Sequence, residues 1–147
     1  MIDSEIGMDP NTSRRVRICR LLVQERKRVG IHLGFDLCPV PAWDMMLDLY
    51  LAFHQGRAVS IWSLCLAANI PTSTAHRKIG EMVEEGIFHR GVDGGRVMVR
   101  LTAPYLEKLD RLFDELGDTA IADGIVHCEP SGPAESRAPP ASSRNTP

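Results

Sequence analysis

Hydroxyl, imidazole and guanidinium side chains gather in one short stretch of the chain, between residues 72 and 77. All of these groups can hydrogen-bond the edges of nucleic-acid bases or the oxygens of phosphates. The residues concerned are Thr72, Ser73, Thr74, His76 and Arg77. A second set of guanidinium groups follows farther along the chain and belongs to Arg90, Arg96 and Arg100. The helices and strands that carry the two sets of residues determine whether both sets can contact the same partner.

The first set lies on a segment with the period of an α-helix. We expect this helix to span residues 72–85, with Thr72 as its N-cap and Gly86 as its stop. Its apolar residues recur at the spacing of one helical face, and they are Ala75, Ile79, Met82 and Val83. Ser73 and Arg77 fall opposite this stripe and are therefore predicted to face outward. The free N–H groups of the helix N-terminus add further donors for phosphate.

A shorter helix is predicted just before this one, over residues 61–68, with the Ser60 hydroxyl as its cap. The three residues 69–71 form the turn between the two helices. After Gly86 the hydrophobic period changes from that of a helix to two, which is typical of strands. The sequence there predicts strands over residues 87–90 and 96–101.

The two strands are joined by a glycine-rich turn, residues 91–95, and form a hairpin. In the second strand Val97, Val99 and Leu101 are predicted to point one way. Arg96, Met98 and Arg100 are predicted to point the other way, with Arg90 nearby. A helix, a turn, a second helix and a hairpin in this order indicate a winged helix-turn-helix. The fold class predicted is mainly α with a small antiparallel β wing and extra N- and C-terminal helices.

Three further helices flank this unit. The first is predicted over residues 14–29, between Ser13 as N-cap and Gly30 as stop. The second is predicted over residues 42–55 and is apolar nearly all round, so it must be covered on several sides, in part by a second subunit. The last begins at Thr102 and Pro104 and reaches about Leu116.

Composition sets the remaining limits. The chain has 147 residues, a formal charge of −2 and four Cys, which suits one domain, residues 13–120, between disordered tails at 1–12 and 121–147. The longest uncharged stretch is broken by polar residues and proline, so no membrane span or membrane partner is expected. The Cys spacing fits neither a disulfide framework nor a metal site, and reduced thiols in the cytoplasm are the simplest interpretation.

Charge is unevenly distributed along the chain. Residues 14–28 hold seven Arg and Lys against one Glu. Such a basic helix is suited to contact DNA, and it is equally suited to pair with the acidic residues of the last helix across a dimer. The sequence leaves both alternatives open.

Residues 42–116 resemble the MarR-type winged-helix transcription regulators. The resemblance rests on VSIWSLCLAANIPTSTAHRKIGEMVEEGIFHR followed by VDGGRVMVRLT. Asp93, Arg96 and the Leu101-Thr102 pair stand where that family has an aspartate, an arginine and a Leu-Thr end. Gly95 stands where the family usually has another arginine. The resemblance implies a homodimer built from terminal helices, double-stranded DNA binding and control of transcription.

The sequence therefore predicts a dimeric, sequence-specific DNA-binding regulator. Its recognition helix, residues 72–85, would enter the major groove, and its wing, residues 87–101, would touch the backbone or minor groove. The alternative is a winged-helix protein-interaction module without DNA binding, favoured by the acidic overall balance and by Gly95. No nucleophile, glycine-rich loop, cofactor motif or metal motif supports an enzyme. No residue supports a particular small-molecule effector.

Overall fold

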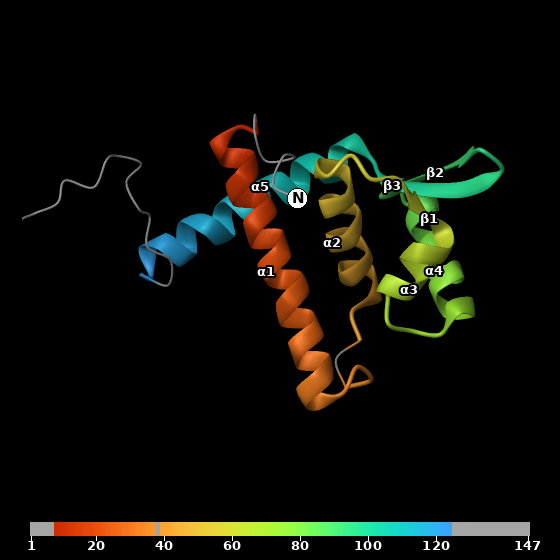
Figure 1. Cartoon of the computed structure of the whole chain (residues 1–147), viewed down its shortest axis with the longest axis horizontal. Helices are drawn as coiled ribbons and strands as arrows, with labels where there is room; N and C mark the ends of the chain where they lie inside the picture. The colour runs from red at the N-terminus through yellow and green to blue at the C-terminus, as the bar shows by residue number, and fades with distance from the viewer. Residues whose placement is uncertain (1–7, 38, 125–147) are drawn as a thin grey trace, which may run out of the picture.

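The computed structural model describes residues 8–37 and 39–124. Five helices and three short strands occur in this part of the chain (Figure 1). In chain order they are α1 (Pro10–Leu33), α2 (Pro41–His54), β1 (Val59–Ser60), α3 (Ile61–Ala67), α4 (Thr72–Glu84), β2 (Phe88–Asp93), β3 (Arg96–Leu101) and α5 (Ala103–Ala122). The three strands form one antiparallel sheet in the order β1-β3-β2.

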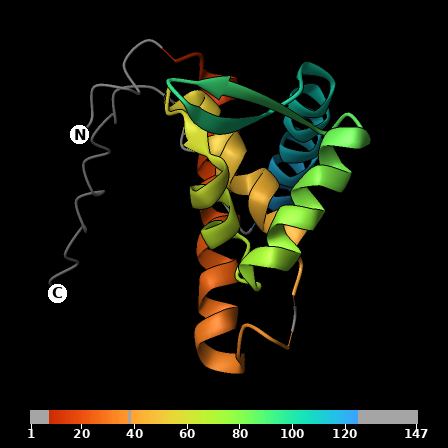
Figure 2. The same ribbon diagram turned by 90° about the vertical axis from the view of Figure 1, so that its right-hand side faces the viewer.

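The predicted fold class is confirmed: the chain is mainly helical with a small antiparallel sheet, an arrangement compatible with a winged helix-turn-helix. Helix α2 lies between α1 on one side and the α3, α4 and sheet unit on the other (Figure 1). Figure 2 looks onto that unit, with α3 and α4 in front and the β2–β3 hairpin across the top.

Helix α2 is covered almost entirely from within the chain. Its Leu47 carbonyl accepts a hydrogen bond from the Cys19 thiol of α1 at 3.4 Å. The rings of Trp43 and Tyr50 pack on Phe113 of α5, at 6.5 and 4.8 Å between centroids. Among α2 residues only Phe53 is exposed. Helices α1 and α5 and the sheet thus supply part of the cover that the apolar α2 requires. Phe53 remains 58% exposed, so cover by a second subunit stays a prediction.

Helix α1 begins earlier than predicted. Asp9, not Ser13, is its N-cap, and the Asp9 carboxylate accepts from the backbone N–H groups of Asn11 at 2.9 Å and Thr12 at 3.3 Å. Pro10 occupies the first helical position, where its missing N–H costs nothing. Residues 10–12, which the sequence analysis assigns to the disordered tail, therefore form the first turn of α1.

Two glycines lie inside helices that continue past the ends predicted from the sequence. Gly30, the predicted stop of α1, is buried because the Phe35 ring packs against the position that a Cβ would occupy. The helix runs on to Leu33 and ends at Gly34, whose φ of +98° favours glycine.

Gly117 lies within α5 where it meets α1, with the Ile18 side chain 3.0 Å from the Cβ position. Helix α5 accordingly passes the predicted end at Leu116 and reaches Ala122. Residues 121–122 are therefore helical, while 1–7 and 125–147 of the two predicted tails lie outside the described residues.

The elements that carry the candidate residues follow the prediction closely. The Ser60 hydroxyl caps α3, accepting from the Ser63 N–H at 3.2 Å. Thr72 is the first residue of α4 rather than its cap, because the chain enters from Pro71 and no side chain caps this end. Strand β1 was not predicted, since two residues are too short to show a period.

The first strand of the hairpin extends farther than predicted. Strand β2 continues past Arg90 to Asp93, and the turn is reduced to Gly94 and Gly95. Both glycines have positive φ, +56° and +77°, which is the geometry that two-residue hairpin turns require.

An ion-pair cluster clamps α1 to α5. The Arg15 guanidinium donates two hydrogen bonds to the Asp114 carboxylate, at 2.8 and 2.7 Å. Arg14 donates to Asp118 at 3.1 Å. The Tyr50 hydroxyl of α2 donates to Asp110 at 2.6 Å, and this bond together with burial raises the pKa of Tyr50. Hydrogen bonds to carboxylates of α5 thus join it to α1 and α2, and the bidentate Arg15–Asp114 contact is of the stronger kind.

The clamp predicts a measurable coupling between Arg15 and Asp114. In a double-mutant cycle of Arg15→Ala and Asp114→Ala, we expect a coupling energy of about 1 kcal/mol in the free energy of unfolding at pH 7, because the pair is bidentate but partly exposed. Denaturant unfolding of the four proteins measures it.

The same cycle has a defined pH dependence. The hydrogen bond from Arg15 holds the pKa of Asp114 below its ordinary value of 3.8. A lowered folded-state pKa means that the stabilisation is complete above the ordinary value and is lost as the pH falls through the lowered one. A coupling energy that stays constant into strong acid, or is absent at pH 7, contradicts the clamp.

Candidate nucleic-acid interface

Helix α4 is buried along one face only. Ala75, Ile79 and Met82 are fully buried, which confirms the predicted stripe. Ser73 and Arg77 are exposed on the opposite face. Helix α4 lies on the side of the molecule that faces the viewer in Figure 2. The burial of three residues therefore determines which polar side chains α4 presents.

The other predicted α4 residues lie around this outward face. Thr72 is exposed at the start of the helix, and Thr74 is half-buried. His76 is half-buried because its ring stands edge-on to Trp62 of α3, at 5.7 Å between centroids. Towards the C-terminus of α4, Glu81 and Glu84 are exposed and would repel phosphates. The N-terminal half of α4 is therefore the part suited to an anionic partner.

The hairpin carries its three arginines on two faces. In an antiparallel sheet, residues directly opposite each other share a face. Arg100 lies opposite His89, and Arg96 opposite Asp93, so these two arginines share the face of Met98, as predicted. Arg90 lies opposite Val99 and therefore belongs to the other face, the one that packs toward the core and α4. All three side chains are exposed.

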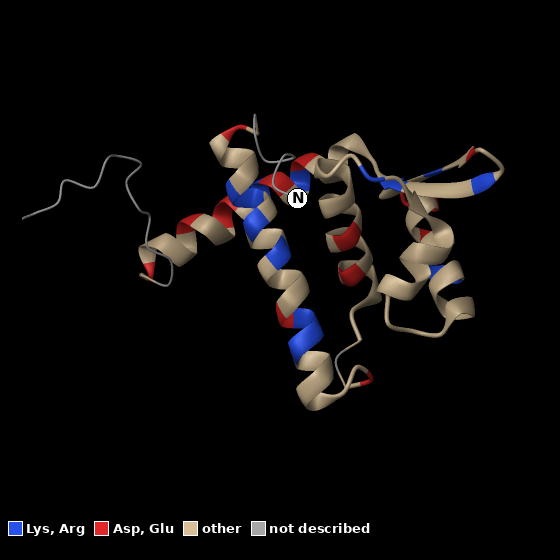
Figure 3. Ribbon diagram, in the orientation of Figure 1, with Lys and Arg blue, Asp and Glu red and all other residues tan. Residues whose placement is uncertain are grey.

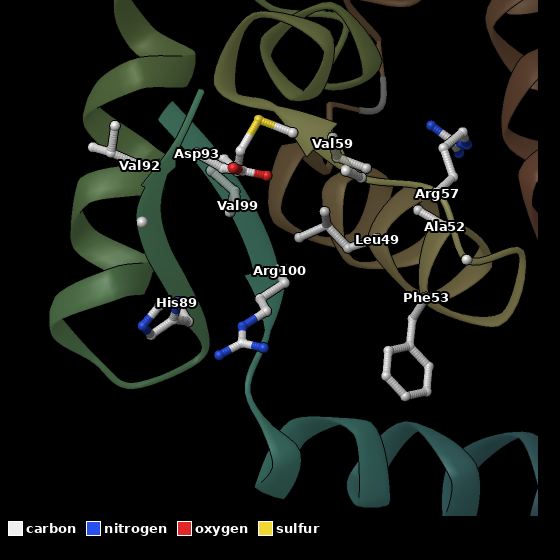
Figure 4. Close-up of a pocket in the computed structure, with 14 residues that line it drawn as sticks. Leu49, Ala52, Phe53, Arg57, Val59, His89, Val92, Asp93, Val99 and Arg100 are labelled. Atoms are coloured by element: carbon white, nitrogen blue, oxygen red, sulfur yellow. The ribbon is translucent and has the colours of Figure 1, made fainter. Parts of the chain in front are cut away.

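The face that holds Arg100 borders a cavity of about 450 Å³ (Figure 4). The cavity lies between the sheet, the end of α2 and the segment after it. Its lining includes Leu49, Phe53, Arg57, His89, Met98 and Arg100. Arg100 thus faces the end of α2 rather than α4, whereas Arg96 stands beside the exposed hairpin turn. The three hairpin arginines are not equivalent.

Three arginines of the basic run of α1 form ion pairs within the chain. Arg14 and Arg15 pair with carboxylates of α5, and Arg26 pairs with Asp44 of α2 at 2.8 Å. Figure 3 shows Lys and Arg along α1 and Asp and Glu along α5. For Arg14 and Arg15, the pairing of α1 with the acidic last helix, predicted as an alternative across a dimer, therefore occurs within one chain. Helix α2 separates α1 from the α4 side (Figures 1 and 2).

The thiols of Cys19 and Cys65 are buried. Burial raises the pKa of Cys19 to about 12 and also raises that of Cys65, so neither thiol is poised to react. Within the described ranges, no group of three or more His, Cys, Asp or Glu side chains is placed to hold a metal ion. None of the helices described here has the length and apolar character of a membrane span. The other two cysteines lie outside the described residues.

No known protein family, curated protein or solved structure matches this chain.

The burial of the two thiols predicts low reactivity. In a Cys38→Ser/Cys128→Ser variant, which leaves only Cys19 and Cys65, we expect an aromatic disulfide reagent to modify neither thiol in the folded protein at pH 8. Both should react after addition of denaturant, and absorbance of the released thiolate measures this. Reaction of either thiol at the same rate with and without denaturant would show that it is accessible.

Proposed function

We propose that the chain is a sequence-specific, double-stranded DNA-binding regulator of transcription, with α4 in the major groove and the β2–β3 hairpin on the adjacent backbone or minor groove. The observation that carries this proposal is the one-sided burial of α4. It leaves Ser73 and Arg77 exposed on a helix that projects from the molecule beside an arginine-bearing hairpin. A helix of this kind fits the width of the major groove.

The ion pairing of the arginines supports the same proposal. Among the described residues, Arg77, Arg90 and Arg96 have no carboxylate within ion-pair distance, whereas Arg14, Arg15 and Arg26 are all paired. Guanidiniums that the fold pairs internally serve its stability. Exposed guanidiniums without an ion pair are available to phosphates and base edges, and three of them lie on α4 and the adjacent hairpin. Arg17 and Arg28 of α1 are also exposed and form no ion pair among the described residues.

We further propose that the chain belongs with the MarR-type regulators and acts as a homodimer in the cytoplasm. Two copies related by a twofold axis would present two α4 helices to successive major grooves. Exposed apolar side chains on the terminal helices support this contact, notably Leu21 of α1 and Leu116 of α5, which are 63% and 39% exposed. Helix α2 offers this contact mainly Phe53, which is its one exposed residue.

Arg77 is the residue that we expect to read a base, because its planar fork can bond O6 and N7 of guanine. Duplexes selected from a random pool by the full chain would supply the cognate site. We expect Arg77→Ala to cost about 1–3 kcal/mol of binding free energy on that site and less on random duplex. Fluorescence anisotropy at one fixed salt concentration measures both.

Arg111→Ala is the matched control, since Arg111 is an exposed arginine on α5 that pairs with Glu107. It should bind both duplexes as the unmodified chain does. Equal losses on cognate and random duplex would make Arg77 a phosphate contact. A chain that binds no duplex at any salt concentration would leave the protein-interaction module as the better account.

The surroundings of the three hairpin arginines predict a ranking, because only Arg100 lines the cavity at the end of α2. Substitution of Arg90 or Arg96 by Ala should lower the slope of log affinity against log salt by about one, because each would neutralise one phosphate. Arg100→Ala should change the slope least, because its side chain borders the cavity at the end of α2. A larger change for Arg100 than for Arg90 and Arg96 would contradict this placement of the duplex.

The dimer contact can be tested through Leu21. Light scattering at micromolar concentration should give twice the chain mass for the unmodified protein and a smaller mass for Leu21→Glu, because burying a carboxylate in an apolar contact is unfavourable. Leu66→Glu, at an even more exposed leucine on α3, serves as the control and should remain a dimer. A monomeric unmodified chain would refute the dimer.

A further inference from the structure

Trp62 has a large side chain for which no role is predicted from the sequence. It stands on the outward face of α3 with 65% of its surface exposed. Exposed large apolar groups next to polar ones mark interaction sites more often than chance. Its indole N–H is a donor that no acceptor in the described part of the chain satisfies.

The position of Trp62 connects it with α4. Its ring meets the His76 ring edge-on, at 5.7 Å between centroids and 87° between planes. His76 lies one residue before Arg77 and flanks the outward face of α4. Helices α3 and α4 lie side by side on the face seen in Figure 2. Trp62 therefore borders the surface proposed to enter the major groove, on the side of the first helix of the pair.

When a helix-turn-helix binds DNA, its two helices occupy different positions on the duplex. The second helix lies in the major groove, and the first crosses the sugar-phosphate backbone. A side chain on the outward face of α3, next to α4, then meets the backbone and not the base edges. Phosphate oxygens accept hydrogen bonds only, and the indole N–H donates only, so the two are complementary.

We propose that Trp62 is a DNA-backbone contact, which donates its indole N–H to a phosphate and holds His76 at the flank of α4. This inference rests on the proposed DNA-binding function. The duplex is favoured over a protein partner because Trp62 is continuous with the proposed DNA surface through His76. A protein partner would instead use Trp62 together with Leu66, one turn farther along the same face of α3.

The test compares four chains on the selected cognate duplex and on random duplex. Trp62→Ala should lower affinity roughly tenfold on both, because a hydrogen bond to a charged acceptor is lost and a phosphate contact is indifferent to sequence. Trp62→Phe should lose most of the same affinity, because it keeps an aromatic ring beside His76 but has no N–H. Leu66→Ala, the control on the same face, should bind as the unmodified chain does.

Fluorescence gives an independent readout of the same contact. The chain has two Trp, and Trp43→Phe removes the one that packs on Phe113. In that variant the emission of Trp62 should become less accessible to acrylamide when duplex is added. Circular dichroism of each variant checks that the fold is kept.

The outcomes separate this inference from the function on which it rests. Normal affinity of Trp62→Ala and Trp62→Phe, with unchanged acrylamide quenching, would overturn the contact while Arg77→Ala still weakens binding. Equal losses for Trp62→Ala and Leu66→Ala would overturn it in favour of an apolar patch. If the unmodified chain binds no duplex, the proposed function fails first and the contact fails with it.

Discussion

The rotation of α4 about its own axis is the constraint on which the rest of the candidate interface depends. It is fixed by the burial of Ala75, Ile79 and Met82, each within 2% of complete. Turning the helix by half a turn would place Arg77 in the core and expose the stripe. The loss of burial would cost on the order of 2 kcal/mol each for Ile79 and Met82. Burial of the apolar face of α4 thus determines the direction in which its polar face points.

The hairpin is tied to α4 at a single junction. The Ile87 N–H donates to the Met82 carbonyl at 2.9 Å, and the Thr102 hydroxyl donates to the Gly86 carbonyl at 2.7 Å. These bonds join the end of α4, the start of β2 and the start of α5. The clamp of Arg14 and Arg15 on α5 then connects the same junction to α1. The clamp to α1 and the junction with the hairpin therefore both involve α5.

Much of this fold could be predicted from the sequence, because the strongest signals are periodic. The stripe of α4, the Ser60 cap and the alternation of Arg96, Met98 and Arg100 all depend on local spacing. Several failures come from packing that the local pattern does not show. Gly30 and Gly117 look like helix stops, but each makes room for another part of the chain. Part of the cover on α2 comes from α1 and α5, which no local pattern of α2 can indicate.

In the candidate site, too, some features could be predicted from local periodicity and others could not. Local periodicity places Ser73 and Arg77 outward, but the face of Arg90 depends on the pairing register of the strands, which puts it opposite Val99. Trp62 could have been found from its spacing, since Ile61, Leu64 and Cys65 define the inner face of α3 and leave Trp62 outside. Its closeness to His76 is a property of the packed pair of helices and is not visible in either segment alone.

The central claim is that the outward face of α4 and the hairpin read duplex DNA. Repeated selection of duplexes from a random pool by the full chain, followed by sequencing, tests it most directly. The account predicts enrichment of a sequence with two related half-sites whose centres are about one helical turn, or a multiple of it, apart. A pool that stays random after several rounds at low salt would contradict it.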